Sequence, residues 1–196
     1  LKYLQSQPWQ QMEFVSLRDD TVTLRTFPSV AEAAGYTVLI NEEDVSPGIA
    51  LPGDWDSYLA QLTKKNRHEL RRKLRRLDTI DEEVAFRALD NTVEIEEWLP
   101  EFFRMMRISR DDKTEFLTIE REQFFQSLAK KLSSLQTLKV FFLDVGQTPV
   151  AAVVCFDYKG VRFLYNSGYD PEYSYLSVSL MLKAWCLRNA IEEGLG

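Results

Sequence analysis

Three apolar segments that follow one another closely near the end of the chain constrain the fold most. Residues 138–145, 150–156 and 161–167 are rich in β-branched and aromatic side chains, which is typical of strands. The short connections between them contain Gly146 and Gly160, residues that favour tight turns. Strands joined by such short connections pair antiparallel, so the sequence predicts a three-stranded meander.

Helical patterns surround this meander. Apolar residues recur at helical spacing over 54–77, where Asp54 is the expected N-cap and Thr63 a candidate break. Further on, we expect a strand at 83–89, helices at 94–106 and 119–135, a charged loop at 109–113, and a last helix from Ser177 to Glu193 that Gly194 ends. The helices must cover the sheet, which predicts an α+β fold class.

The first quarter of the chain is less regular. We expect a helix end at 1–5, a strand at 12–17, a helix from Asp19-Asp20 to Gly35, a strand at 36–40 and an extended stretch at 45–51. Pro28 is expected to kink or break that helix. Pro52-Gly53-Asp54 then predicts a boundary between this part and the rest.

Rare residue types argue against several chemistries. The one histidine, His68, lies in a basic run and not near a nucleophile motif, so a Ser-His-Asp site is not indicated. The chain holds two cysteines and eight glycines, with no phosphate loop, which argues against a zinc centre and a dinucleotide fold. Cys155 and Cys186 lie in apolar runs, so we expect buried, inert thiols and a reducing cytoplasm. No apolar run approaches the roughly 18 residues of a membrane span.

Positive charge is concentrated in residues 64–76. This run has eight Lys or Arg and one acid, whereas the rest of the chain carries 16 basic and 29 acidic residues, a net charge of −13. Lys64, Arg67, Arg71 and Arg75 share one helical face. Three interpretations stay open: a solvated face, a clamp for an anionic substrate such as a nucleotide-linked sugar, a phosphate or an acyl-tRNA, and a DNA-binding surface that the acidic body would oppose.

Five short motifs add to the element order. They are Leu-Pro-Gly-Asp-Trp at 51–55, Leu-Thr-Lys-Lys-Asn-Arg at 62–67, Lys-Thr-Glu-Phe at 113–116, Pro-Val-Ala-Ala at 149–152 and Tyr-Asn-Ser-Gly-Tyr-Asp-Pro at 165–171. With the order β-α-α-β-β-β-α from residue 83 onward, they resemble the GNAT acyltransferases of the FemAB-like, or CelD-type, family. The resemblance covers residues 50–196.

The resemblance implies a GNAT-like fold, the acyl-CoA N-acyltransferase fold, in a bacterial cytoplasmic protein. Such proteins look like two GNAT halves in tandem. Residues 1–51 would be the C-terminal part of a first half, and residues 52–196 a second half that lacks its final strands. The implied donor is acetyl-CoA or another acyl-CoA, and no metal is implied.

The resemblance also implies where the donor binds. Its diphosphate would lie at the start of the last helix, where free N–H groups and the helix dipole attract anions. The expected contacts there are Tyr175, Ser177, Val178 and Ser179. Asn166, Ser167 and Gly168 would bond the pantetheine amides and polarise the thioester carbonyl. An ordinary Ser-capped helix and an ordinary turn remain open for these two segments.

The implied reaction is direct transfer of the acyl group to an amine of a small molecule or of a glycan precursor for the cell envelope or a polysaccharide. Lys113 and Asp170 are the candidates for orienting or deprotonating that amine; no other catalytic residue is indicated. Lys64, Arg67, Arg71 and Arg75 are the candidate substrate contacts. Two alternatives stay open, namely a Fem-type transferase that uses aminoacyl-tRNA, and a non-catalytic module that binds an anionic partner through residues 64–76.

Overall fold

The computed structural model describes residues 8–195. The expected helix end at 1–5 lies outside them. The chain divides into two compact units, Leu1–Gly48 and Ile49–Gly196, here called the N-terminal unit and the C-terminal unit.

The N-terminal unit holds one described helix, α2 (Val22–Ala33). Its N-cap is Thr21, whose Oγ1 accepts a hydrogen bond from the Leu24 N–H at 3.3 Å, and not the expected acidic pair before it. Pro28 lies inside the helix without ending it, and Gly35 follows with the positive φ of +87° expected of a helix stop.

The strands expected at 12–17 and 36–40, and the extended stretch at 45–51, contain no strand. The two strand predictions are wrong, because β-branched sequence makes a strand only where a neighbouring strand pairs with its peptide groups; residues 45–51 form neither a helix nor a strand, so the expected extended stretch is not contradicted. Leu39, Ile40 and Val45 are instead strongly exposed.

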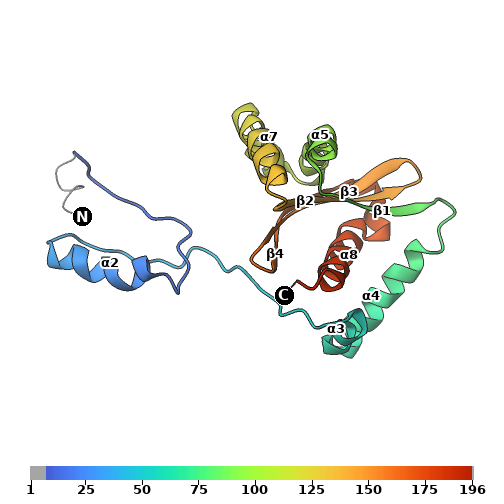
Figure 1. Cartoon of the computed structure of the whole chain (residues 1–196), viewed down its shortest axis with the longest axis horizontal. Helices are drawn as coiled ribbons and strands as arrows, with labels where there is room; N and C mark the ends of the chain where they lie inside the picture. Colours follow the sequence, from blue (N-terminus) through green and yellow to red (C-terminus); the bar gives the residue numbers. More distant parts are fainter. Residues whose placement is uncertain (1–7, 196) are drawn as a thin grey trace. The chain divides into compact units, whose positions relative to one another are not determined.

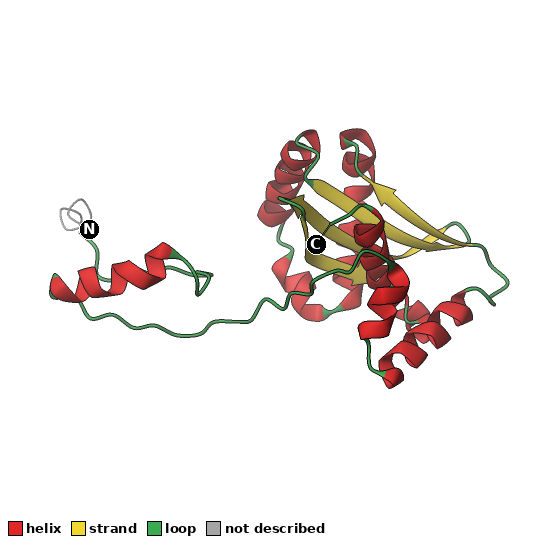
Figure 2. Cartoon of the chain, turned by 60° about the horizontal axis from the view of Figure 1, so that its bottom comes forward, coloured by secondary structure: helices red, strands yellow, loops and turns green. Residues whose placement is uncertain are grey.

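The C-terminal unit is built on a four-stranded antiparallel sheet. Its strands are β1 (Val84–Leu89), β2 (Leu138–Val145), β3 (Thr148–Tyr158) and β4 (Val161–Tyr169). Each pairs with the next along the chain, so the order is β1-β2-β3-β4 and β4 forms one edge. Figure 2 shows this sheet in yellow with helices packed against it. The predicted meander is therefore confirmed, and the strand expected at 83–89 extends it.

Helices cover both faces of the sheet, which confirms the α+β class. In Figure 1, α5 (Thr92–Ser109) and α7 (Ile119–Ser134) lie above the sheet. Below it lie α8 (Val178–Glu192), α3 (Trp55–Gln61) and α4 (Lys64–Leu77). The break expected at Thr63 is confirmed, because Thr63 caps α4 by accepting from the Asn66 N–H.

The charged loop expected at 109–113 is wrong in part. The chain turns at Arg110, which is extended, and then forms the short helix α6 (Asp111–Phe116). Asp111 and Asp112 stand in its first turn, where negative charge favours a helix. This helix brings Lys113 to the edge of the sheet.

Alternation along the strands divides the core in two. Phe141, Leu143 and Cys155 face α8 and α4, whereas Val140 and Phe142 face α5 and α7. All five side chains are fully buried. Cys155 and Cys186 are both free and buried, as predicted, and burial raises the pKa of the Cys186 thiol.

A bulge interrupts this alternation in β4. Val154 pairs with Asn166 and Cys155 with Leu164, so Tyr165 has no partner on β3. The inserted residue places Tyr165 and Asn166 together on the α5 side of the sheet, where both line one small cavity. The bulge therefore exposes two neighbouring side chains to the same space.

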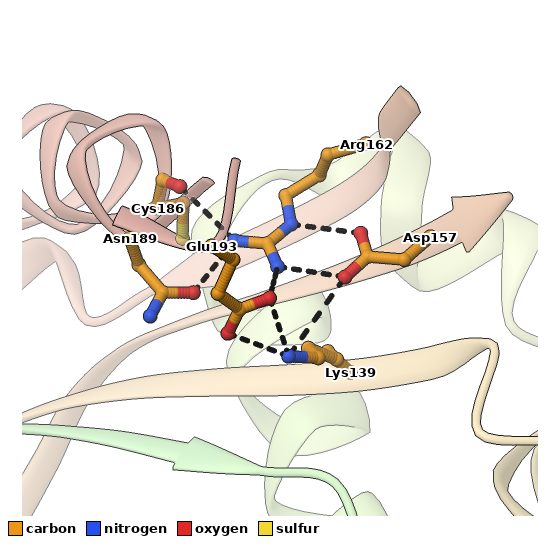
Figure 3. A network of polar contacts seen from close by, with 6 residues as sticks. All are labelled: Lys139, Asp157, Arg162, Cys186, Asn189 and Glu193. Atoms are coloured by element: carbon orange, nitrogen blue, oxygen red, sulfur yellow. Dashed lines mark hydrogen bonds and ion pairs between the residues drawn. The ribbon is translucent and has the colours of Figure 1, made fainter. Parts of the chain in front are cut away.

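An ion network fixes the end of α8 to the sheet (Figure 3). The Arg162 guanidinium on β4 bonds Asp157 at 2.7 and 2.8 Å and Glu193 at 3.0 Å. Lys139 on β2 bonds the same Glu193 at 2.6 Å. Burial alone would lower the pKa of Arg162, but its acidic partners raise it, so the guanidinium stays charged inside the protein.

Candidate functional site

The open edge of β4 carries a small polar cluster at its end. The Ser167 N–H donates to Oδ1 of Asn166 at 2.8 Å, and the Lys113 Nζ donates to the Ser167 carbonyl and, at 3.0 Å, to Asn166 Oδ1. Since β3 occupies the other edge of β4 and side chains bond both peptide groups of Ser167, these groups point to the open edge. A ligand lying along this edge would find an N–H donor and a C=O acceptor on one residue.

Lys113 is a half-buried ammonium without a carboxylate partner among the described residues. Burial lowers its pKa, and the positive charges of Lys183 and Arg110 lower it further. The nearby Asp112 offsets only part of this lowering, because its carboxylate also bonds Arg110 at 2.8 and 2.9 Å. Lys183, on α8, has no partner among the described residues either.

Aromatic side chains hollow the α5 face of the sheet beside this cluster. A cavity of about 30 Å³ and a smaller one of about 10 Å³ share Phe102, Phe103, Phe125 and Tyr165 in their walls. Asn166 lines the smaller one. Spaces of this size accept a methyl group or a water molecule, and no long aliphatic chain.

Gly168 has a packing role. A Cβ atom added there would lie 2.5 Å from backbone atoms of Met105 and Met106 on α5, closer than atoms approach. The glycine therefore lets β4 and α5 pack backbone to backbone, and its own surface is buried.

The turn before α8 forms the second part of the site. A 3₁₀ turn, η1 (Pro171–Leu176), leads into Ser177, which adopts the left-handed conformation with φ 58°. The first bond within α8 runs from the Met181 N–H to the Ser177 carbonyl. The N–H groups of residues 178–180 thus have no acceptor among the described residues, whereas the Ser177 N–H already donates to Ser174.

The basic helix contacts this turn. The Nζ of Lys73 lies 2.6 Å from Oγ of Ser177, and the Arg76 guanidinium lies 5.6 Å from the ring centroid of the exposed Tyr175. One cation therefore contacts the residue just before the free N–H groups of α8, and a second lies over Tyr175, two residues earlier in the chain.

The basic residues chosen from the sequence lie elsewhere. Arg67 donates to the carbonyls of Leu59 and Ala60, at the end of α3. Lys64, Arg71 and Arg75 are exposed. Sequence reasoning selected the face opposite the leucines and missed Lys73, although its position between Leu70 and Leu74 places it at the border of the buried face.

Asp170 has a structural partner. Its carboxylate accepts a hydrogen bond from the Glu172 N–H at 3.0 Å and so caps η1. Its own N–H donates to Val150 on β3. These bonds hold Asp170 within the turn. Of the two candidate catalytic residues, Lys113 is therefore the one whose side chain lies at the open edge of β4.

Two further properties concern residues 8–195. They hold no group of three or more His, Cys, Asp or Glu able to bind a metal ion. No helix in that range combines the length and the apolarity that crossing a bilayer needs.

A family model described as an acetyltransferase (GNAT) domain matches residues 64–196. An aminoglycoside acetyltransferase from an uncultured soil metagenomic sample, solved with sisomicin, is 16% identical over 58% of this chain and 73% of its own, with a TM-score of 0.41. A GCN5-related N-acetyltransferase from Kribbella flavida is 19% identical over 57% and 28% of the two chains, with a TM-score of 0.41. A conserved protein of unknown function from Bacteroides thetaiotaomicron is 14% identical over 72% and 47%, with a TM-score of 0.48. No curated protein matches the chain.

Proposed function

Because the chain belongs to the GNAT acetyltransferase family, whose domain model matches residues 64–196, we propose that it binds an acyl-coenzyme A and transfers the acyl group to an amine. The acyl-CoA N-acyltransferase fold expected from the sequence is confirmed by this match. The main support for a donor site is the contact between Lys73 and Ser177, next to the unpaired N–H groups in the first turn of α8.

The turn suits a diphosphate. Free N–H groups at residues 178–180 give directed donors, and the helix dipole adds a partial positive charge. Lys73 and Arg76 supply the full charges that the turn lacks. Charge-assisted bonds from an ammonium to a phosphate are about twice as strong as neutral ones, so the basic helix would provide much of the donor affinity.

The edge of β4 suits the pantetheine arm. Its amide groups can pair with the outward N–H and C=O of Ser167, in place of the present bonds to Asn166 and Lys113. A thioester carbonyl laid along this edge would meet an N–H donor, which stabilises the oxyanion that forms during acyl transfer.

The chemistry on the protein side is mainly positioning. A neutral acceptor amine attacks the thioester carbon directly, and the acyl group leaves the sulfur without an enzyme-bound intermediate. The two small aromatic cavities, of which Asn166 lines the smaller, suit an acetyl or another short acyl group better than a long one.

The finer assignment rests on the motifs at 51–55 and 165–171. They support a place among the FemAB-like, CelD-type members and an acceptor amine on a small molecule or a glycan precursor. The two buried free thiols, Cys155 and Cys186, support a cytoplasmic location. A Fem-type, aminoacyl-tRNA-dependent reaction is the second candidate. The exposed cations Lys64, Arg71 and Arg75 on the outer face of α4 favour it, because a phosphate backbone could lie along them.

Calorimetric titration separates these candidates. We expect acetyl-CoA to bind at least about tenfold more tightly than acetyl-pantetheine, which has the same thioester and arm but no diphosphate. Absence of acetyl-CoA binding, with salt-sensitive tRNA binding that Arg71→Glu and Arg75→Glu abolish, would replace the acetyl-CoA proposal by a tRNA-dependent or purely binding role.

A further inference from the structure

We propose that Lys113 is itself an acyl acceptor, and that its ε-amine takes the acyl group from a thioester bound along the β4 edge. This proposal rests on the proposed function, because the donor must lie at that edge. The product is a chain with one acylated lysine in its own site.

Position is the first reason. The Lys113 Nζ already lies within hydrogen-bonding distance of the Ser167 carbonyl and of Asn166 Oδ1. The donor arm would pair with the same peptide groups. An amine held at the point where the thioester arrives reacts as in an intramolecular step, which raises rates by orders of magnitude over a free amine.

Charge is the second reason. Only the neutral amine is nucleophilic, and burial together with Lys183 and Arg110 shifts the pKa of Lys113 in the direction that increases its neutral fraction. Three other lysines each lie within 4 Å of a carboxylate, whereas no such carboxylate lies beside Lys113 among the described residues. They are Lys73 beside Glu69, Lys130 beside Glu96 and Lys139 beside Glu193.

The step balances without any further reagent. The lone pair of neutral Nζ forms a bond to the thioester carbon, and the C–S bond breaks with its electron pair on sulfur. Nitrogen loses one proton and the departing thiolate gains one, so the products are an amide on Lys113 and free coenzyme A thiol. No oxidant, reductant or metal ion takes part.

The consequence is a change of charge within the site. An amide is stable to hydrolysis at neutral pH, so acyl-Lys113 is a mark and not a turnover intermediate. It removes one positive charge from the pair with Lys183 and fills the space beside Ser167. Acylated chains would therefore bind the donor less tightly than unmodified chains.

Peptide mass spectrometry after incubation with isotope-labelled acetyl-CoA tests the proposal on the full chain. We expect Lys113 to be acetylated at least about tenfold faster than Lys130, whose side chain is 71% exposed. A small thioester without a nucleotide, S-acetyl-N-acetylcysteamine, serves as the second reagent. Its preference for Lys113 should be smaller, because it lacks the diphosphate that positions the donor.

Two variants test the cause. Lys183→Met removes a neighbouring positive charge, so it should raise the Lys113 pKa and slow its acetylation, whereas Lys183→Arg should preserve the rate. Lys65→Met, an exposed change on α4, serves as the control for altered net charge.

Three outcomes are decisive. Equal labelling of Lys113 and Lys130, with acetyl-CoA binding intact by calorimetry, overturns the inference and leaves the proposed function standing. An equal preference for Lys113 with both reagents also overturns it, because donor binding would then contribute nothing. Loss of acetyl-CoA binding itself refutes the proposed function and the inference together.

Discussion

The Nζ atom of Lys73 on α4 lies 2.6 Å from Oγ of Ser177, the residue that precedes α8 and stands 104 positions later in the chain. This contact joins the positively charged helix to the turn where α8 begins. Ser177 is held there in the left-handed conformation, which an L-residue adopts at a cost of roughly 1–2 kcal/mol. The pair thus places a positive charge beside the N–H groups of residues 178–180, which have no acceptor among the described residues.

Lys73→Met should weaken acetyl-CoA binding about tenfold, or about 1.4 kcal/mol, because the diphosphate loses a charge-assisted partner. Isothermal titration at low ionic strength measures the change. Lys65→Met is the matched control, since it removes the same charge from an exposed position of α4. An equal loss in both variants would show that only the net charge of the helix matters.

Gly168→Ala should destabilise the C-terminal unit by about 1–3 kcal/mol, because the added Cβ would overlap the α5 backbone at Met105 and Met106. Urea unfolding followed by circular dichroism gives the value. Gly53→Ala is the control, as nothing lies within 4 Å of its added Cβ. If both variants unfold at the same urea concentration, β4 and α5 are farther apart than the structure has them.

Arg162→Met should cost about 1.5–3 kcal/mol, since the largely buried Asp157 loses two charge-assisted hydrogen bonds and keeps only Lys139, 3.9 Å away. In contrast, Arg188→Met breaks an exposed pair with Glu192 in the same region and should cost less than about 0.5 kcal/mol. Comparison of the two unfolding free energies checks the prediction. Similar small losses would mean that the network in Figure 3 does not fix α8.

Stability should fall as the pH rises above about 9, and Cys186 should contribute to that fall. Burial raises the pKa of this thiol in the folded chain above its usual value of 9.0, so the folded state keeps a proton that the unfolded state releases. The free energy of unfolding then decreases by up to about 1.4 kcal/mol per pH unit. Cys186→Ala should reduce this slope in unfolding measurements between pH 8 and 10, and an unchanged slope would contradict the assignment.

Helix starts, helix ends and tight turns could be predicted from a few neighbouring residues. Asp54 caps α3 as expected, and the break expected at Thr63 is there because Thr63 caps α4; in both, a side-chain oxygen accepts from the N–H three residues on. Gly35 and Gly194 lie just after the ends of helices and have positive φ, a conformation that only glycine adopts freely. The meander followed from short turns between apolar runs.

The site was less predictable. Lys113 was a candidate for its place near the acceptor, but its contact with Ser167 depends on α6, which the charged sequence had suggested to be a loop. Lys73 and Lys183 were not selected, because the groups they influence, Ser177 and Lys113, stand on other elements. Strands predicted at 12–17 and 36–40 failed since no neighbouring strand pairs with them.

By itself, the sequence determined the order of strands and helices in the C-terminal unit, the concentration of charge in one helix and the resemblance to an acyltransferase. These depend on periodicity, capping and turn residues, which act over a few positions. Only the tertiary structure decided which cation contacts the start of α8, how the bulge at Tyr165 turns Asn166 toward α5, and why Lys113 has no carboxylate partner within residues 8–195. Such relationships join residues far apart in the chain, and packing of the helices on the sheet brings them together.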